Sequence, residues 1–195
     1  MTRLATRLSV VAHASTAALR KAAFPADEPL DSFGERDCAR ITLDWRPARV
    51  FIAPELRARQ TAAALGLAGE IVPALRDCDY GRWAGRSVKE IDEADPEGFG
   101  RWLAEPDTAP HGGESHRAVL ERIAAWFGGF GIQPSHSVLV AHPITVRAAI
   151  LHVLGAGAGA FQSVDAWPLS AADFTGATYG RRWHFRSLAR LAAEA

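Results

Sequence analysis

The stretch SVLVAHPITVRAAILHVLG (residues 137–155) joins an apolar run to a histidine and then to a helical sequence that ends at glycine. The run SVLVA is short and rich in valine, as expected for a strand that is covered on both faces. Proline is well tolerated in the first turn of a helix, and Gly155 is a typical helix stop. A strand joined directly to a helix predicts part of a βαβ unit, with His142 at the carboxyl end of the strand.

Three more short apolar runs predict strands, and the segments between the strands have helical patterns. The further strands are expected at residues 8–12, 49–53 and 70–74, and the helices at 36–43, 57–65, 115–130 and 143–155. Near the C-terminus, a glycine-rich turn precedes RWHFRSL, whose alternation predicts an edge strand that could run antiparallel. We therefore expect an α/β fold, a three-layer αβα sandwich around a mostly parallel sheet, with residues 1–195 as one domain.

Composition excludes several classes of protein. Lys plus Arg and Asp plus Glu each number 22, so no basic field for nucleic acid is expected. Cys38 and Cys78 lack any metal-ligand spacing, which predicts no metal site and a reducing cytoplasm. The N-terminus superficially imitates a signal peptide, but His13 and Ser15 interrupt its short apolar stretch. We expect a cytoplasmic protein that does not bind membranes, since no run approaches the length of a membrane span.

Chemically capable side chains follow all four predicted strands. They are His13, Arg57, Asp77 and His142. Each one taken singly has an ordinary structural explanation, as a satisfied histidine or a solvated charge. Because the carboxyl ends of parallel strands share one edge of a sheet, however, the fold should bring all four together. The sequence therefore predicts a functional site at this edge.

Six segments, in order over about residues 8–155, match the motifs of one family. VAHAST (11–16) stands where the family has Arg-His-Gly, and APELRARQTAAALG (53–66) resembles SP-x-x-RA-x-QTA. LRDCDYGRWAGRSVKEI (75–91) resembles L-x-E-x-x-x-G-x-W-E-G, and PHGGES (110–115) resembles P-x-GES. EPLDSFGERDCAR (28–40) is similar to PLT-x-x-G-x-x-QA, and residues 138–155 align with the second-histidine motif. The chain thus resembles the histidine phosphatase superfamily, which has the phosphoglycerate-mutase-like fold.

The resemblance implies phosphoryl transfer through a phosphohistidine, with neither metal nor cofactor. His13 would attack phosphorus as a neutral imidazole. Arg57 and His142 would hold the phosphoryl oxygens, because catalysis needs preorganised positive donors there. Asp77 occupies the position of the family's glutamate, which would protonate the leaving oxygen. The implied partner is a small phosphorylated substrate or inorganic phosphate.

The chain departs from the family at the strand that carries the nucleophile. Ala12 replaces the motif arginine and Ala14 replaces the motif glycine. Losing one preorganised donor costs roughly 3–4 kcal/mol, or on the order of 10²–10³ in rate. Arg20 or Lys21 could replace the missing arginine, and a solvated basic edge is the alternative interpretation.

The second departure from the family motif is at the residue expected to act as the acid. Asp77 is one methylene shorter than glutamate, which withdraws the carboxyl group by about 1 Å. Glu114, in the GGES turn, is a second acid near the site, with helix-terminus stabilisation as its alternative role. Ser15 and Thr16 are further potential donors to a phosphate.

These observations leave two hypotheses. The first is a phosphomonoesterase weakened or retuned by the loss of the motif arginine. The second is a catalytically inactive relative that binds a phosphorylated ligand or partner. The short span from Trp83 to GGES predicts no elaborate lid, which favours a phosphatase over a mutase that shelters its phosphoenzyme from water. The tail after residue 160 could support a homodimer.

Overall fold

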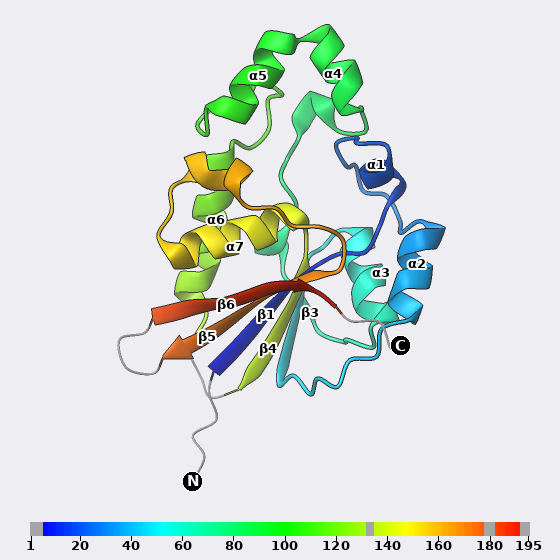
Figure 1. Cartoon of the computed structure of the whole chain (residues 1–195), viewed down its shortest axis with the longest axis vertical. Helices are drawn as coiled ribbons and strands as arrows, with labels where there is room; N and C mark the ends of the chain where they lie inside the picture. The colour runs from blue at the N-terminus through cyan, green and yellow to red at the C-terminus, as the bar shows by residue number, and fades with distance from the viewer. Residues whose placement is uncertain (1–5, 132–134, 178–181, 192–195) are drawn as a thin grey trace.

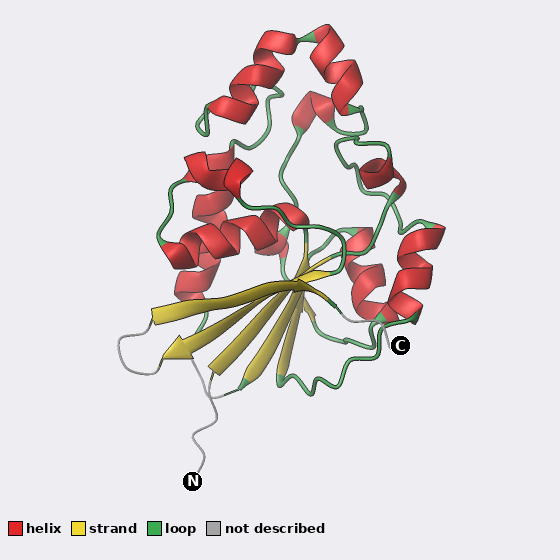
Figure 2. Cartoon of the chain, in the orientation of Figure 1, coloured by secondary structure: helices red, strands yellow, loops and turns green. Residues whose placement is uncertain are grey.

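One mixed sheet with helices on two sides organises the molecule (Figure 1). The computed structural model describes residues 6–131, 135–177 and 182–191. Within them, six strands are ordered β3-β2-β4-β1-β5-β6. The pairs β1–β4, β4–β2 and β2–β3 are parallel, whereas β1–β5 and β5–β6 are antiparallel. The α/β architecture is therefore confirmed (Figure 2).

The strands and helices have the following bounds. The strands are β1 Thr6–Ala12, β2 Arg49–Ile52, β3 Glu70–Ile71, β4 His136–Ala141, β5 Ser170–Ala177 and β6 Arg182–Arg190. The α-helices are α1 Ala17–Arg20, α2 Ser32–Ala39, α3 Leu56–Ala64, α4 Val88–Ala94, α5 Pro96–Ala104, α6 His116–Gly129 and α7 Pro143–Leu154. Short 3₁₀ helices occur at η1 Pro73–Leu75, η2 Gly81–Trp83 and η3 Ala158–Ser163.

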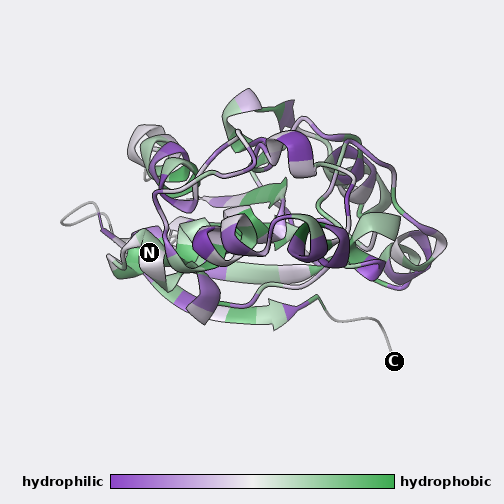
Figure 3. Cartoon of the chain, turned by 90° about the horizontal axis from the view of Figure 1, so that it is seen from above, coloured by the Kyte–Doolittle hydropathy of each residue, from purple (hydrophilic) through white to green (hydrophobic). Residues whose placement is uncertain are grey.

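Apolar side chains fill both faces of the central strands. Val10 and Val11 of β1 and Leu139 of β4 are completely buried, which explains why their sequences are continuous apolar runs. Helices α6 and α7 pack on each other, as do α2 and α3. Figure 3 shows hydrophobic residues along the strands and hydrophilic ones on outward turns of the helices. Within the described part of the chain, no helix has the length and apolar character needed to cross a membrane.

Three sequence expectations need correction. The helix expected at 36–43 is α2, which begins at Ser32 because the Asp31 carboxylate accepts hydrogen bonds from the N–H groups of Phe33 and Gly34. The strand expected at 70–74 stops at Ile71, since Pro73 has no N–H for a ladder and starts η1 instead. Strand β5 was not anticipated. The antiparallel edge strand is β6, as expected, and its predicted glycine-rich turn includes residues outside the described ones.

A helical pair projects above the carboxyl ends of the strands, so the expectation of little room for a lid is wrong. Helices α4 and α5 form this pair, at the top of Figure 1. A second apolar cluster, separate from the main core, holds the pair to the body. It contains Phe24, Trp83, Ile91 and Trp102. Ring centroids of Phe24 and Trp102 lie 5.4 Å apart, so a residue of the segment between α1 and α2 contacts the helical pair directly.

The N-terminus of α2 supports the loop that follows β1. The Ser15 hydroxyl donates to the Asp31 carboxylate at 3.1 Å, and the Asp31 N–H donates to the Ser15 carbonyl at 3.1 Å. Gly34 packs on the same backbone, where an added Cβ would stand 2.4 Å from the Ser15 carbonyl oxygen. Glycine at position 34 therefore permits the close approach of helix and loop.

We expect Gly34→Ala to lower the free energy of unfolding by roughly 1–3 kcal/mol, because backbone must move to admit the methyl group. Gly100→Ala in α5 is the matched control, since a Cβ there meets nothing within 4 Å. The control should be neutral or stabilising by about 0.5–1 kcal/mol. Urea denaturation of both variants measures the difference, and equal stability would contradict the packing constraint at Gly34.

Candidate functional site

His13 follows β1 directly and presents one ring nitrogen as a free base. Its backbone N–H continues the parallel ladder to the Ala141 carbonyl at 2.8 Å. The ring Nδ1 lies 2.7 Å from the Ala14 carbonyl oxygen, which only accepts, so Nδ1 carries the proton and Nε2 keeps its lone pair. Burial, with the nearby positive charges of His142 and Arg57, lowers the pKa of His13 to about 3. The ring is therefore neutral near pH 7 and competent as a nucleophile.

His142 follows β4 and faces His13 edge to face. The two ring centroids lie 5.3 Å apart with the planes at 69°. His142 is completely buried, and its Nε2 donates to the Glu55 carboxylate at 2.7 Å. Its Nδ1 makes no hydrogen bond within the described residues and lies 3.5 Å from an Asp77 carboxylate oxygen. Both nitrogens of this ring thus face carboxylates.

Arg57 lies in the first turn of α3 with only 1% of its surface exposed. One terminal nitrogen donates to Asp77 Oδ2 at 2.5 Å, and the other donates to the Ala26 carbonyl at 2.6 Å. The second nitrogen also lies 3.8 Å from a Glu28 carboxylate oxygen. The guanidinium is thus engaged by protein oxygens on two sides.

Asp77 follows η1 and contacts the other charged groups of the site. Its Oδ1 accepts from the Cys78 N–H at 2.8 Å, while Oδ2 takes the contact with Arg57. Its own N–H donates to Glu55 Oε1 at 3.0 Å. The structure therefore brings His13, Arg57, Asp77 and His142 to one place, at the sheet edge where the sequence puts them.

Glu55 is the site residue that sequence reasoning missed. Burial alone would raise the pKa of Glu55, but the hydrogen bond and charge of His142 and the Asp77 N–H lower it to about 2. The carboxylate is consequently ionised near pH 7. The available signal was an acidic residue two positions before Arg57 in APELRARQT, at a motif position that carries no specified residue type.

Three other expected site residues hold the loop after β1 and are not among the described residues that line the cavity. The Ser15 hydroxyl is bound to Asp31, and the Thr16 side chain caps α1 by accepting from the Leu19 N–H. The Arg20 guanidinium lies 4.0 Å from the centre of the Phe33 ring and 3.8 Å from Asp31. Arg20 is therefore already engaged on the surface beside α2.

Glu114 serves a structural ion-pair cluster. Its two oxygens accept from Arg122 at 2.9 and 2.8 Å, and Arg76 adds a contact of 2.8 Å. The Asp79 N–H also donates to it at 3.2 Å. The helix-capping alternative belongs to Ser115 instead, whose hydroxyl accepts from the Ala118 N–H. Glu114 thus ties the segment after η1 to helix α6.

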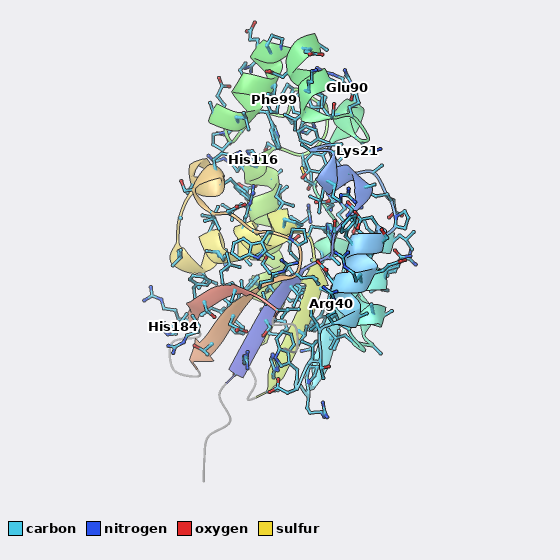
Figure 4. The ribbon with its side chains drawn as sticks, turned by 45° about the vertical axis from the view of Figure 1, so that its right-hand side comes forward. Lys21, Arg40, Glu90, Phe99, His116 and His184 are labelled. Carbon is cyan, nitrogen blue, oxygen red and sulfur yellow. The ribbon has the colours of Figure 1, made fainter. Side chains whose placement is uncertain are left out.

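A cavity of about 340 Å³ opens beside His13 and Asp77, whereas the catalytic candidate His142 and the candidate anion ligand Arg57 are not among the described residues that line it. Its walls are mainly apolar and aromatic: Leu19, Phe24, Tyr80, Val88, Phe99, Trp102, Leu103 and Ile144. In Figure 4, Phe99 comes from the upper helical pair and His116 from the body beneath it. Besides His13 and Asp77, the wall contains the polar residues His116, Arg147 and Gln162. A larger hollow of about 690 Å³, between the end of α7 and β6, contains none of the site residues.

The side chains of the site define the chemistry that it can perform. Among the described residues, no group of three or more His, Cys, Asp or Glu side chains is arranged to hold one. The available groups are instead a neutral imidazole, a second imidazole, a guanidinium and carboxylates. Such a set can perform nucleophilic attack, anion binding and proton transfer.

Comparison with known proteins agrees with the geometry. A family model described as the histidine phosphatase superfamily (branch 1) matches residues 8–188. A bifunctional protein of Mycobacterium tuberculosis is 33% identical over 135 residues, covering 65% of this chain but only 37% of that protein. The glucosyl-3-phosphoglycerate phosphatase of Mycolicibacterium vanbaalenii is 30% identical over 146 residues, covering 67% of this chain and 61% of that protein.

A solved structure gives the same fold. A putative alpha-ribazole-5'-P phosphatase of Escherichia coli superposes with a TM-score of 0.83 and 20% identity, covering 98% of this chain and 99% of the other. At that identity the likeness concerns the fold alone. The chain spans little more than a third of the bifunctional relative, so that protein's whole activity is not transferred.

The buried histidines predict how stability depends on pH. Burial lowers the pKa of His13 to about 3 and that of His116 to about 4. Below about pH 6.5 the unfolded chain takes up protons at these rings while the native protein does not, so stability falls as pH falls toward 4. Each such ring contributes up to about 1.4 kcal/mol per pH unit. Thermal unfolding should show a lower Tm at about pH 5 than at about pH 7.5.

His116→Gln provides the control for this pH dependence. The variant loses one of the contributing rings, so its Tm should fall less steeply with acid than that of the wild type. His116 lies 4.4 Å from Trp102 between ring centroids, so the variant is compared by slope and not by absolute Tm. A wild-type Tm that is constant or rises toward about pH 5 would contradict the assignment of neutral buried rings.

Proposed function

Because this chain belongs to the histidine phosphatase superfamily (branch 1), we propose that it hydrolyses small phosphomonoesters through a phosphohistidine at His13. The observation that carries the proposal is the state of the His13 ring. Its Nδ1 donates a proton to the hydrogen bond with the Ala14 carbonyl, so Nε2 keeps its lone pair. The residue lines the cavity. A fixed tautomer removes the need to rotate or deprotonate the nucleophile before attack.

The first step forms the phosphoenzyme. His13 Nε2 attacks phosphorus while the bond from phosphorus to the leaving oxygen breaks. Asp77, in its protonated form, gives its proton to that oxygen, so the alcohol departs neutral. Among the described residues that line the cavity, Asp77 is the only carboxylic acid, which is the support for this role.

The second step returns the enzyme to its starting state. The Asp77 carboxylate takes a proton from water while the water oxygen attacks phosphorus. The bond from phosphorus to Nε2 breaks, inorganic phosphate leaves and His13 regains its lone pair. Arg57 and His142 are the candidate donors to the phosphoryl oxygens, although both face protein carboxylates in this structure. With Ala12 in place of the motif arginine, we expect slow turnover.

The cavity walls support a substrate whose organic part is small and apolar or aromatic. Burying an aromatic ring against such walls is favourable by about 25 cal/mol per Å² of apolar surface. Among the described wall residues, Arg147 is the only arginine or lysine, and its guanidinium also contacts Asp165 at 3.2 Å. One polar or anionic substituent on the substrate would thus have a partner.

The thiols support a cytoplasmic location. Cys38 and Cys78 are free and buried. Burial raises the pKa of Cys38 to about 11 and shifts the pKa of Cys78 upward as well. Thiols of this kind stay protonated and unreactive, so they suit a reducing compartment and need no disulfide partner.

The direct test is hydrolysis of p-nitrophenyl phosphate by the wild type and by His13→Gln. We expect measurable wild-type turnover and a loss on the order of 10³-fold or more in the variant, because the attacking nitrogen is gone. His184→Gln is the control, since that ring is exposed on β6, and it should retain wild-type activity. Quenching under alkaline conditions followed by mass spectrometry should detect one phosphoryl group on the wild type only.

The second candidate function is non-catalytic binding of a phosphorylated ligand. It is favoured by Ala12 and by the carboxylate of Glu55 at His142, which together weaken the oxyanion contacts. Binding of phosphate without any turnover by the pure wild type would support it and reject the enzyme. Activity that survives His13→Gln would also reject the proposed intermediate.

The cavity predicts a preference among substrates. We expect 1-naphthyl phosphate to be hydrolysed with a higher kcat/KM than glycerol phosphate, because its rings contact the aromatic walls. Phe99→Ala should raise KM for the aryl ester roughly tenfold and leave glycerol phosphate little changed. Leu154→Ala is the control, as this leucine is 60% exposed at the end of α7. Equal effects of Phe99→Ala on both substrates would contradict this specificity.

A further inference from the structure

The wall of the cavity beside His13 contains three polar side chains that the proposed reaction does not use. They are His116 at the start of α6, Arg147 of α7 and Gln162 of η3. Helices α6, α7 and η3 pack against one another, so residues from three separate parts of the chain reach the same wall. In Figure 4, His116 lies beneath the upper helical pair. These three residues are available to contact a part of the ligand other than its phosphoryl group.

Arg147 has hydrogen-bonding capacity that the protein leaves unused. Its side chain is 27% exposed, and one terminal nitrogen donates to Asp165 at 3.2 Å. Its Nε is buried and makes no hydrogen bond within the described part of the chain. A buried donor without an acceptor is costly, so an acceptor supplied by a ligand would be stabilising. The Asp165 side chain is 82% exposed, and such an ion pair contributes little energy. A ligand anion can therefore compete with Asp165 for this guanidinium.

His116 adds a neutral hydrogen-bonding group near Arg147. The residue is only 4% exposed, and its ring packs against Trp102 and Phe161 with centroid distances of 4.4 and 5.0 Å. Burial and the nearby charge of Arg147 lower the pKa of His116 to about 4, so the ring is neutral near pH 7. A neutral imidazole has one donor nitrogen and one acceptor nitrogen. His116 can thus donate to an anion without adding a second positive charge.

The charge of this part of the wall indicates which kind of anion it suits. Arg147 contributes one positive charge, whereas His116 and Gln162 are uncharged. One guanidinium balances one carboxylate, and its planar N–H groups match the two carboxylate oxygens. A doubly charged phosphate would have no second cation among these three residues. The chemistry therefore favours a carboxylate.

We propose that Arg147, together with His116 and Gln162, forms a carboxylate-binding subsite, so that the substrate is a phosphomonoester whose apolar or aromatic part carries a carboxylate group. This inference rests on the proposed function, which places the phosphoryl group at His13. The organic part of the substrate then lies against the apolar walls, and its carboxylate accepts hydrogen bonds from the subsite. Arg147 determines specificity and takes no part in the bond changes at phosphorus.

The first experiment compares two ligands of nearly equal size that differ by one negative charge. They are para-carboxyphenylphosphonate and para-carbamoylphenylphosphonate, and neither can be hydrolysed because carbon replaces the ester oxygen. The meta-substituted pair is measured as well, since it directs the group to another part of the wall. By calorimetry of the wild type, we expect the carboxylate of at least one pair to bind roughly fivefold more tightly than its amide, or better. A smaller preference in both pairs, or no binding of any ligand, would overturn the proposal.

The second experiment repeats the measurement on Arg147→Gln, with the pair that shows the larger preference. The ratio of the two Kd values should fall to about one, because the charge that distinguishes carboxylate from amide is gone. General damage to the cavity weakens both ligands and leaves this ratio unchanged. Arg101→Gln is the matched control, since Arg101 is exposed, pairs with Glu105 on α5 and is not among the described wall residues. The control should keep the wild-type ratio.

The third experiment uses Asp165→Asn, which removes the carboxylate that competes for Arg147. Because Asp165 is exposed, we expect this variant to fold, and its preference for the carboxylate ligand should equal or exceed that of the wild type. A preference lowered by Asp165→Asn, or one that persists unchanged in Arg147→Gln, would contradict the subsite. If Arg147→Gln does not fold, the wild type and Asp165→Asn decide.

The outcomes separate this inference from the proposed function, since the phosphonates report binding without turnover. Absence of p-nitrophenyl phosphate hydrolysis, together with the expected carboxylate preference, would reject the enzyme and leave the subsite in place. Hydrolysis that is lost in His13→Gln, together with equal binding of carboxylate and amide by the wild type, would support the phosphatase and overturn the subsite.

Discussion

The parallel pairing of β1 with β4 is the constraint on which the site depends. The register sets Ala12 opposite Ala141, so the next residue of each strand is a histidine at the same edge of the sheet. The ladder continues one step further, from the His13 N–H to the Ala141 carbonyl, which fixes the backbone of His13, the proposed nucleophile. A one-residue slip would move the side chains of one strand to the opposite face and separate the two rings. The chemistry of the site is thus a consequence of strand register.

Electrostatics then decides how strong this site is. An arginine buried to 99% must be paired, because an isolated buried charge is far too costly. Asp77 and the Ala26 carbonyl accept from the two terminal nitrogens of Arg57, and Glu55 accepts from Nε2 of His142. These contacts stabilise the fold in the absence of ligand. They also mean that an incoming phosphoryl group exchanges existing hydrogen bonds for new ones, so its net gain is reduced.

The sequence predicted the parts of the structure that depend on local pattern. The strands that carry His13 and His142, and the helices after Glu55 and His142, were recoverable from apolar runs and helix signals. The helical pair α4–α5 was missed, since its apolar residues are few and form a separate small cluster with Phe24, which is distant in sequence. The roles of Glu55 and Glu114 were not recoverable either. Their partners come from other elements, and no local pattern specifies which carboxylate reaches which donor.

Ala12 and Glu55 are best understood together. An arginine at position 12 would add one cation at the phosphoryl site, and a neutral residue at position 55 would remove one carboxylate. Compared with a chain that has arginine at position 12 and a neutral residue at position 55, this chain is more negative by two charge units near His13. Both differences weaken the binding of a dianion. Restoring the arginine alone would leave Nε2 of His142 bound to Glu55, so the electrostatics would be only half restored. Under the proposed function, alanine at position 12 and a carboxylate at position 55 therefore shift the charge around His13 in the same direction.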